Sequence, residues 1–297
     1  MFQALDSLEA IVAAAARHGL SLVDATLDTM GLDYLAVHAR DPAGVRWIVR
    51  APRRADVAAA ASLEARVLSV VRGRIGVAVP DWRIADDVIA YPRLDGTPVV
   101  TLDQGAPAWN GIDPASPTPA FLEAIGRVLA ALQRVTDVLL PARTISEERA
   151  ECSRIVRKAC ELIDPPAQLI ERWERWVDND AMWPTHVALS HGDMHPGHLL
   201  LDEGGALTGI LDWTEARVGD PAIDLAMMLR CFNREALETI VTAFAAHGGT
   251  TWPQIVEHVI ERVSLFPAQA ADWAARTNNE SILEYARSEM RRDIGAT

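Results

Sequence analysis

The sequence predicts an α+β protein of two lobes, with a small antiparallel sheet in the N-terminal lobe and a larger, mainly helical C-terminal lobe. Short apolar strands separated by turn residues fill much of the first 95 residues, whereas helical apolar spacing dominates the remainder. The 297 residues, of which 49% are hydrophobic, also exceed what one domain usually needs. We therefore expect lobes of residues 1–95 and 96–297.

The N-terminal lobe is expected to begin with a helix over residues 6–18, capped by Asp6 or Ser7. Turn residues then separate three strands that form an antiparallel meander. The expected strands are Val23–Asp28, Tyr34–Ala39 and Trp47–Ala51. Residues 56–72 show the spacing of a further helix, which contains Glu64.

The segment that follows this helix is expected to close the sheet and connect the lobes. A strand region is predicted at Val77–Pro80 and Trp82–Ile84, before a buried strand at Val88–Tyr91. The buried strand runs into Pro92-Arg93-Leu94-Asp95-Gly96, which is typical of a connector. Residues 104–119 are rich in Pro, Gly, Ala and Asp, and they predict a loop or insertion.

Helical spacing predicts most of the C-terminal lobe. Helices are expected at 119–135, 146–163 and 166–179, in a segment through about Phe232, and at three or more places near the end of the chain. Asp220 and Asp224, which introduce the helix ending near Phe232, are interpreted as helix caps or loop-bracing acceptors.

The stretch from Ser190 to Asp212 concentrates the candidate chemistry. Asp193, His195 and His198 follow one another among glycines and a proline that forbid regular helix. Two short apolar runs about a Gly-Gly turn then predict a hairpin in which His198 faces Asp212. A carboxylate, an imidazole and a second carboxylate in one place could bind a metal ion and accept a proton. The alternative is an ordinary polar loop without a chemical role.

A second candidate feature joins the third strand to the helix after it. Arg50 ends the strand and Glu64 lies in the helix, so an ion pair could aim Arg50 at a phosphate. Each side chain could equally lie on a solvated face.

Charge and composition limit the function classes. The net charge of −13 argues against a broad nucleic-acid surface. No apolar run has the length of a membrane span, and the three cysteines form no metal cluster, so we expect a cytoplasmic protein with core thiols. Lys158 is the only lysine, which coding bias explains, and any role that similar proteins give to a lysine must fall to arginine unless Lys158 fills it.

These residues resemble the aminoglycoside phosphotransferase family of kinase-like enzymes, and within it the macrolide 2′-phosphotransferases. The resemblance rests on three strings: the loop His191-Gly-Asp-Met-His-Pro-Gly-His198, the segment Asp212-Trp-Thr-Glu-Ala216 with Gly219-Asp-Pro221, and the strand Trp47-Ile-Val-Arg-Ala-Pro-Arg-Arg54. It covers nearly the whole chain and implies a two-lobed protein-kinase-like fold.

The resemblance implies direct phosphoryl transfer. Asp193 would take the proton of the acceptor hydroxyl, Asp212 and His198 would hold magnesium, and Arg50, fixed by Glu64, would cradle the phosphates. The donor implied is GTP, or ATP, since residue chemistry does not distinguish the two. Its base would bond to backbone near Pro92 and Leu94.

Two positions depart from the broader family. His198 stands where that family commonly has asparagine, and magnesium prefers oxygen, so a role in phosphate binding is the alternative to a metal ligand. Arg50 replaces the usual lysine, and a guanidinium can still grip phosphate oxygens.

The implied acceptor is the 2′-hydroxyl of the amino sugar of a macrolide antibiotic, which makes the expected role macrolide resistance by a monomeric enzyme. This large, apolar and cationic ligand needs an apolar groove rimmed with acids. The candidates are Trp213, Glu215, Met227, Met228 and Phe232, for most of which core packing is the better interpretation. His195 is as well explained by a structural role as by a functional one.

Three other functions stay open. A kinase could act on an aminoglycoside, a sugar or an amino-alcohol. A metal-dependent hydrolase could use Asp193, His195, His198 and Asp212 as a transition-metal site. A catalytically silent nucleotide-binding protein is disfavoured because all the proposed chemical positions are filled.

Overall fold

The computed structural model describes residues 4–31, 33–103 and 106–293. Contacts divide the chain into two compact units, each described below by itself. The sheet unit comprises Met1–Ile112, Asp137–Leu140 and Pro196–Ala216, and the helical unit comprises Asp113–Thr136, Pro141–His195 and Arg217–Thr297. Residues 196–216 therefore belong to the sheet unit, although residues of the helical unit precede and follow them in the chain.

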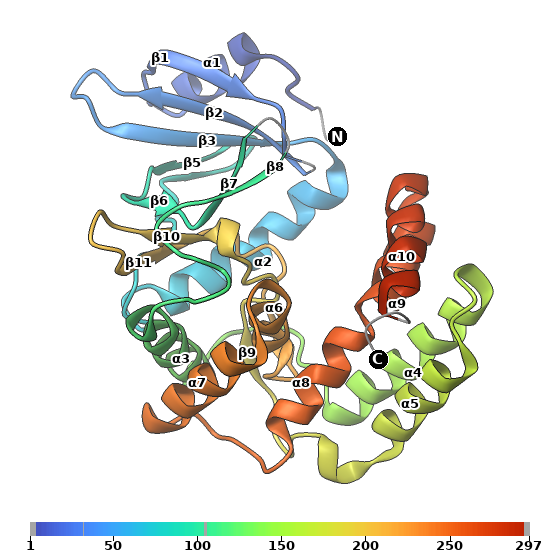
Figure 1. Ribbon diagram of the computed structural model, residues 1–297. Helices are drawn as coiled ribbons and strands as arrows, with labels where there is room; N and C mark the ends of the chain where they lie inside the picture. The colour runs from blue at the N-terminus through green and yellow to red at the C-terminus, as the bar shows by residue number, and fades with distance from the viewer. Residues whose placement is uncertain (1–3, 32, 104–105, 294–297) are drawn as a thin grey trace. The chain divides into compact units, whose positions relative to one another are not determined.

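The sheet unit is built on a five-stranded antiparallel sheet with the order β1-β2-β3-β5-β4 (Figure 1). Its strands are β1 Val23–Asp28, β2 Tyr34–Arg40, β3 Arg46–Pro52, β4 Ile84–Ala85 and β5 Ile89–Pro92. The predicted meander is confirmed, because β1, β2 and β3 follow one another in sequence and in space.

Helix α1, Leu8–Arg17, covers one face of this sheet. The Ser7 side chain accepts a hydrogen bond from the Ala10 N–H and so caps the helix, as one of the two predicted cap residues. Ile11, at helical spacing from Ala14 and Ala15, then packs against buried β-strand side chains such as Val37 and Val49.

Helix α2, Ala55–Val71, lies on the chain between β3 and β4 and confirms the helix predicted over 56–72. It buries Val57, Val67, Leu68 and Val71 together with Glu64. A buried carboxylate on an apolar helix face needs a partner, which the site below supplies.

A second, three-stranded sheet of the sheet unit has the order β11-β10-β6. The strands are β6 Thr97–Pro98, β10 Leu199–Leu201 and β11 Leu207–Ile210. The predicted hairpin is confirmed, because Leu199 pairs with Ile210 and the turn closes through the bond from Gly205 N–H to Asp202 O. Strand β6 completes the sheet beside β10 and was not predicted.

The expectation of a loop over 104–119 is only partly right. Strand β8, Ala106–Trp109, pairs with β7, Val100–Asp103, in a separate hairpin. Gln104 and Gly105 lie outside the described residues. Pro107 does not prevent the pairing, since proline is tolerated in edge strands.

Among the described residues, the helical unit contains the three predicted helices that precede the loop around Asp193 and five helices that follow it. They are α3 Pro119–Gln133, α4 Ile145–Leu162, α5 Ala167–Asp178, α6 Ile223–Cys231, α7 Arg234–Ala246, α8 Ile255–Ser264, α9 Phe266–Thr277 and α10 Glu280–Asp293. A capping box between Thr144 and Glu147 fixes the start of α4.

Close packing joins α3 to α7 in this unit. Gly126 lies in α3 where a Cβ would stand 2.6 Å from the Ala243 Cβ and 2.7 Å from the Ile240 carbonyl oxygen. Glycine is therefore required for the backbones to approach this closely.

Tryptophans dominate a second core of the helical unit. Trp173 and Trp176 on α5 are buried beside Trp183, with the rings of Trp176 and Trp183 stacked 4.9 Å apart. The Trp173 indole N–H donates to the Ser264 hydroxyl, so this large side chain is buried with its polar atom satisfied.

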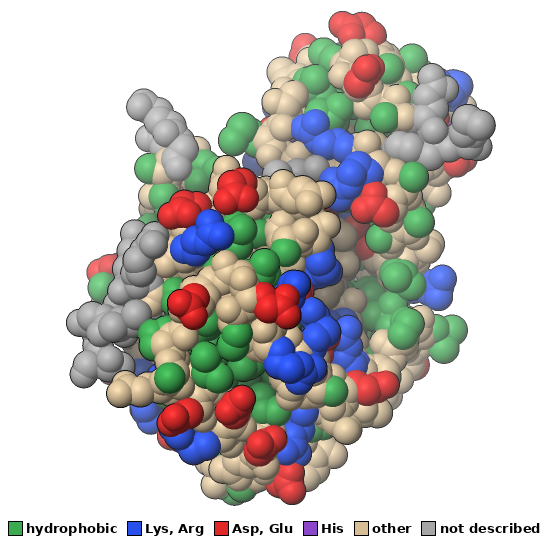
Figure 2. Space-filling view, turned by 90° about the vertical axis from the view of Figure 1, so that its right-hand side faces the viewer, with side chains coloured by type: hydrophobic (Ala, Val, Ile, Leu, Met, Phe, Trp, Pro, Cys, Tyr) green, Lys and Arg blue, Asp and Glu red, His purple; other side chains and the backbone are tan. Residues whose placement is uncertain are grey.

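The surface mixes charges of both signs. Figure 2 shows acidic and basic side chains interspersed with apolar ones on the face it displays. Among the described helices, none is long and apolar enough to cross a membrane. The expectation that all three thiols are core residues is wrong in part, because Cys152 is buried but Cys160 is exposed.

Candidate active site

The loop that contains Asp193 is held by its backbone. Strand β9, Ala188–Ser190, leads into the loop and pairs with β12, Arg217–Gly219. The N–H groups of His191 and Gly192 donate to the two carboxylate oxygens of Asp224, at 2.8 and 2.9 Å. Asp224 is therefore the loop-bracing acceptor that the sequence predicted.

The bracing carboxylate is fully enclosed by the helical unit. Burial raises the pKa of Asp224 to about 6, although the two N–H donors and Arg217 oppose that rise. Gly192 adopts φ +88°, a left-handed conformation that glycine reaches without strain. The turn before Asp193 is thus fixed by a buried acceptor and a glycine together.

Asp193 follows this turn with its carboxylate partly exposed. Its N–H donates to His191 Nδ1 at 3.3 Å, and its carboxylate lies 3.8 Å from His195 Nε2. The Asp193 carboxylate is thus accessible while the Asp193 backbone is fixed by a hydrogen bond, an arrangement that suits a proton acceptor.

The open end of the β10–β11 hairpin, opposite its turn, brings His198 and Asp212 together. His198 ends the short 3-10 helix Pro196–His198, and its carbonyl accepts a hydrogen bond from Leu211 N–H at 2.9 Å. His198 Nε2 consequently lies 3.8 Å from Asp212 Oδ2, as the hairpin register predicted. Asp212 itself adopts φ +53°, in the left-handed region that Asp and Asn tolerate.

Asp212 is held in its anionic form. Burial alone would raise the pKa of its carboxyl, but His198, Arg50 and hydrogen bonds from Thr214 bring the pKa below its ordinary value. The Asp212 side chain is 43% exposed, so its carboxylate remains available to a cation.

Arg50 and Glu64 form the predicted ion pair. Arg50 Nη2 donates to Glu64 Oε2 at 2.8 Å, and both residues are buried, at 8% and 2% exposure. The alternative of two solvated side chains is therefore wrong.

Three aromatic rings surround the Arg50 guanidinium, at 4.3 Å for Tyr34, 5.4 Å for Trp82 and 5.9 Å for Tyr91. Burial alone would lower the pKa of Arg50, but Tyr91 and Glu64 raise it above its ordinary value. The arginine stays charged because cation–π contacts and one carboxylate replace water around it.

Thr214 was not predicted as a site residue. Its hydroxyl donates to Glu64 Oε2 at 3.3 Å, and its N–H donates to Asp212 Oδ1 at 3.3 Å. Thr214 lies in the motif Asp212-Trp-Thr-Glu-Ala216, but no local pattern links it to Glu64, because the two residues are 150 positions apart.

Pro92 and Leu94 lie where the sheet ends. Pro92 closes β5 opposite Trp47, and the next residue, Arg93, donates its N–H to the Arg46 carbonyl at 2.8 Å. Their proposed contact with a nucleotide base stays a prediction.

The residues suggested for the acceptor differ in exposure. Trp213 and Met228 have no exposed surface and are core side chains, which agrees with the interpretation of core packing made from the sequence. Phe232 is half-buried, with its ring edge-on to Phe121 at 5.8 Å, and Glu215 is exposed. Acceptor contacts by Phe232 and Glu215 stay predictions.

Asp220 belongs to a buried network rather than to the exposed chemistry. Its Oδ2 lies 2.7 Å from His258 Nε2 and accepts from Arg262 Nε, while Trp176 Nε1 donates to His258 Nδ1 at 3.1 Å. No local sequence pattern links His258 and Arg262 to Asp220, because they lie 38 and 42 positions away in the chain.

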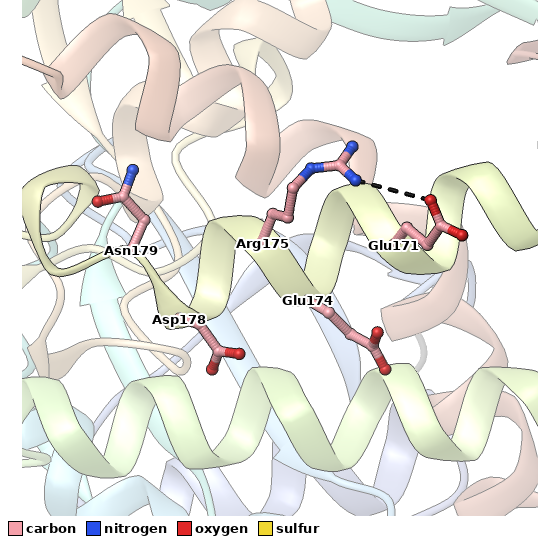
Figure 3. Close-up of a pocket in the computed structure, with 5 residues that line it drawn as sticks. All are labelled: Glu171, Glu174, Arg175, Asp178 and Asn179. Atoms are coloured by element: carbon pink, nitrogen blue, oxygen red, sulfur yellow. Dashed lines mark ion pairs between the residues drawn. The ribbon is translucent and has the colours of Figure 1, made fainter.

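A hollow on α5 contains none of the predicted site residues. Figure 3 shows its lining, in which Arg175 turns toward Glu171 at 3.7 Å and Glu174, Asp178 and Asn179 line the remainder. These exposed side chains form the polar face of a helix whose other face buries Trp173 and Trp176.

Comparison with known proteins places this geometry in a family. Residues 24–258 match the model of the phosphotransferase enzyme family, APH. A Bacillus subtilis (strain 168) protein described as "Uncharacterized protein YcbJ" is 36% identical over 287 residues, which is 93% of each chain.

Solved structures show the same fold along nearly the whole chain. A "Macrolide 2'-phosphotransferase type I" is 35% identical with a TM-score of 0.87, covering 97% of this chain and 98% of its own. The apoenzyme of macrolide 2'-phosphotransferase MphH from Brachybacterium faecium is 33% identical with a TM-score of 0.86, covering 95% and 98%. The predicted α+β, kinase-like fold is confirmed, and the chain belongs to the phosphotransferase enzyme family.

Proposed function

We propose that this phosphotransferase transfers the γ-phosphate of GTP, or of ATP, to the 2′-hydroxyl of the amino sugar of a macrolide antibiotic. The observation that carries the proposal is the arrangement at the open end of the β10–β11 hairpin. There Asp212 and His198 lie 3.8 Å apart, and Thr214 links Asp212 to the Arg50–Glu64 pair. Its similarity to two macrolide 2'-phosphotransferases, at 35% and 33% identity, supports the macrolide as acceptor.

Asp193 is the proposed proton acceptor. The acceptor oxygen would form a bond to the γ-phosphorus as the bond from that phosphorus to the β–γ bridging oxygen breaks, and Asp193 would take the hydroxyl proton. The nucleoside diphosphate would leave with the bonding pair on its terminal oxygen. The bond from Asp193 N–H to His191, and the Asp224 brace behind it, would keep the carboxylate oriented.

Arg50 is the proposed phosphate-binding cation. Glu64 fixes one edge of its guanidinium and the Tyr34 ring covers its face, so the side chain is preorganised. A preorganised cation loses little conformational freedom when phosphate binds.

Asp212 and His198 are the residues that would hold magnesium. The partly exposed, anionic carboxylate of Asp212 fits a hard cation, whereas the His198 imidazole is a less favourable ligand. When bound, magnesium would neutralise charge on the phosphates.

Transfer assays with separate nucleotides test the proposal. Purified protein is incubated with erythromycin or kanamycin and with magnesium plus GTP or ATP, and phosphorylated product is measured by mass spectrometry. We expect a mass increase of one phosphoryl group on erythromycin only. Transfer to kanamycin without transfer to erythromycin would instead identify an aminoglycoside kinase.

The Asp193→Asn variant tests the proposed base. The amide keeps the shape of the side chain but does not accept the proton, so turnover should fall by about 10²–10⁴-fold, the usual contribution of a general base. Affinity for GDP, measured by calorimetry, should stay near that of the wild type. Turnover close to the wild-type rate would remove Asp193 from this role.

A further inference from the structure

One residue of the sheet unit, Thr214, hydrogen-bonds to both carboxylates of the proposed nucleotide-binding site. The Thr214 hydroxyl donates to Glu64 Oε2, the same oxygen that accepts from Arg50 Nη2 at 2.8 Å. The Thr214 N–H donates to Asp212 Oδ1 at 3.3 Å. Thr214 thus lies between a carboxylate that orients the arginine and a carboxylate suited to magnesium.

These two carboxylates disfavour each other's charge. Burial is the main reason that the pKa of Glu64 is raised, Arg50 opposes the rise, and Asp212 adds to it. Glu64 is 2% exposed, so water screens little of this repulsion. A hydrogen-bond donor between the two carboxylates offsets the repulsion at short range.

We propose that Thr214 is a positioning residue that sets Asp212 in register with the Arg50–Glu64 pair, through its hydroxyl rather than through its backbone. The backbone N–H reaches Asp212 whatever the side chain at position 214, whereas the bond to Glu64 needs a hydroxyl. The inference rests on the proposed function, because it concerns how the chain prepares for a nucleotide and its magnesium.

The hydroxyl can be removed while the shape of the side chain is kept. Thr214→Val deletes the donor, and Thr214→Ser restores it without the methyl group. Thr208→Val is the matched control, because Thr208 lies in β11, close to Thr214 in the chain, but its hydroxyl donates to the carbonyl oxygens of Leu200 and Asp95.

The test measures binding of a fluorescent GDP analogue to each variant with magnesium and with EDTA, alongside thermal unfolding. In Thr214→Val we expect the gain in affinity from magnesium to shrink about tenfold, the order expected when a hydrogen bond to a charged group is lost. In transfer assays KM for the nucleotide should rise more than kcat falls. Thr214→Ser and Thr208→Val should keep the wild-type gain.

The outcomes separate this inference from the proposed function. If the wild type binds GDP more tightly with magnesium and Thr214→Val does the same, the positioning role is overturned and the proposed function is not. A lower unfolding temperature in Thr214→Val with an unchanged magnesium gain would show a structural role only, which also overturns the inference. If the wild type gains nothing from magnesium, both fall. Magnesium-dependent binding without macrolide transfer would overturn the proposed acceptor alone.

Discussion

Arg50 shows how a cation can be kept inside an apolar lobe. Its guanidinium lies among three aromatic rings and has one anionic partner, Glu64. Lysine, with a compact and strongly hydrated ammonium, would lose more hydration in this aromatic box than arginine does. The arginine in place of the family's usual lysine therefore matches its surroundings.

Removing the Glu64 carboxylate should leave the Arg50 guanidinium buried without its anionic partner. We expect Glu64→Ala to reduce the free energy of unfolding by about 3–5 kcal/mol, as when one partner of a buried ion pair is removed. Urea unfolding followed by fluorescence measures the change. Glu203→Ala, on an exposed turn, is the control and should stay within about 0.5 kcal/mol of the wild type. An equal loss in both variants would contradict the assigned role.

The sequence anticipated residues whose partners are close in the chain. His198 and Asp212 were predicted to meet because a hairpin fixes their register, and Arg50 and Glu64, 14 residues apart, because a helix follows the strand that ends with Arg50. Thr214, His258 and Arg262 were missed, since their partners lie 150, 38 and 42 residues away. Contacts at such separations depend on tertiary packing, which no local pattern encodes.

At the scale of elements, long periodic segments and the β10–β11 hairpin, which a Gly-Gly turn marks, were predictable, whereas three other short strands were not. The first three strands and the helices α1 to α5 lie close to their expected positions, because each shows several repeats of its hydrophobic period. Strands β6, β9 and β12 contain only two or three residues, too few to show alternation. Such strands exist because a neighbouring strand offers hydrogen bonds, which the sequence does not reveal.

The contact between α3 and α7 gives an element-scale prediction. Gly126→Ala should destabilise the protein by about 1–3 kcal/mol, because the added Cβ would overlap Ala243 and the Ile240 carbonyl. The sign of the change in stability is informative, since in a helix without such a contact replacing glycine by alanine stabilises the helix by about 1 kcal/mol. Thermal unfolding distinguishes the two, and a stabilised variant would show that the helices can separate without penalty.

For the whole molecule, acid sensitivity should arise partly from one buried histidine of the helical unit, His258. Burial lowers the pKa of His258, while Asp220 opposes the decrease. A ring that accepts from Trp176 at Nδ1 and faces Asp220 with Nε2 is best satisfied when neutral. The unfolded chain therefore binds more protons than the folded one near pH 6.5, and stability falls as the pH drops through that value.

Comparison with a variant isolates this contribution. His258→Gln should be less stable than the wild type at pH 7.5 but should lose less stability between pH 7.5 and pH 5.5. The comparison is needed because Asp224, with its pKa raised to about 6, makes the folded state more stable as the pH falls from roughly 6 to 4, which opposes the effect of His258. His38→Gln, at an exposed position, should retain the wild-type loss. Parallel losses in wild type and His258→Gln would exclude His258 as the source.

The left-handed backbone at Asp212 has a consequence for how this protein could lose its activity in evolution. Asparagine and glycine are the residues that best tolerate φ +53° in place of aspartate, and each is reached from an aspartate codon by a single-base change. The most accessible mutations at the proposed metal site would thus preserve the fold while removing the charge. Decayed copies of this gene should accordingly encode stable, inactive proteins rather than unfolded ones.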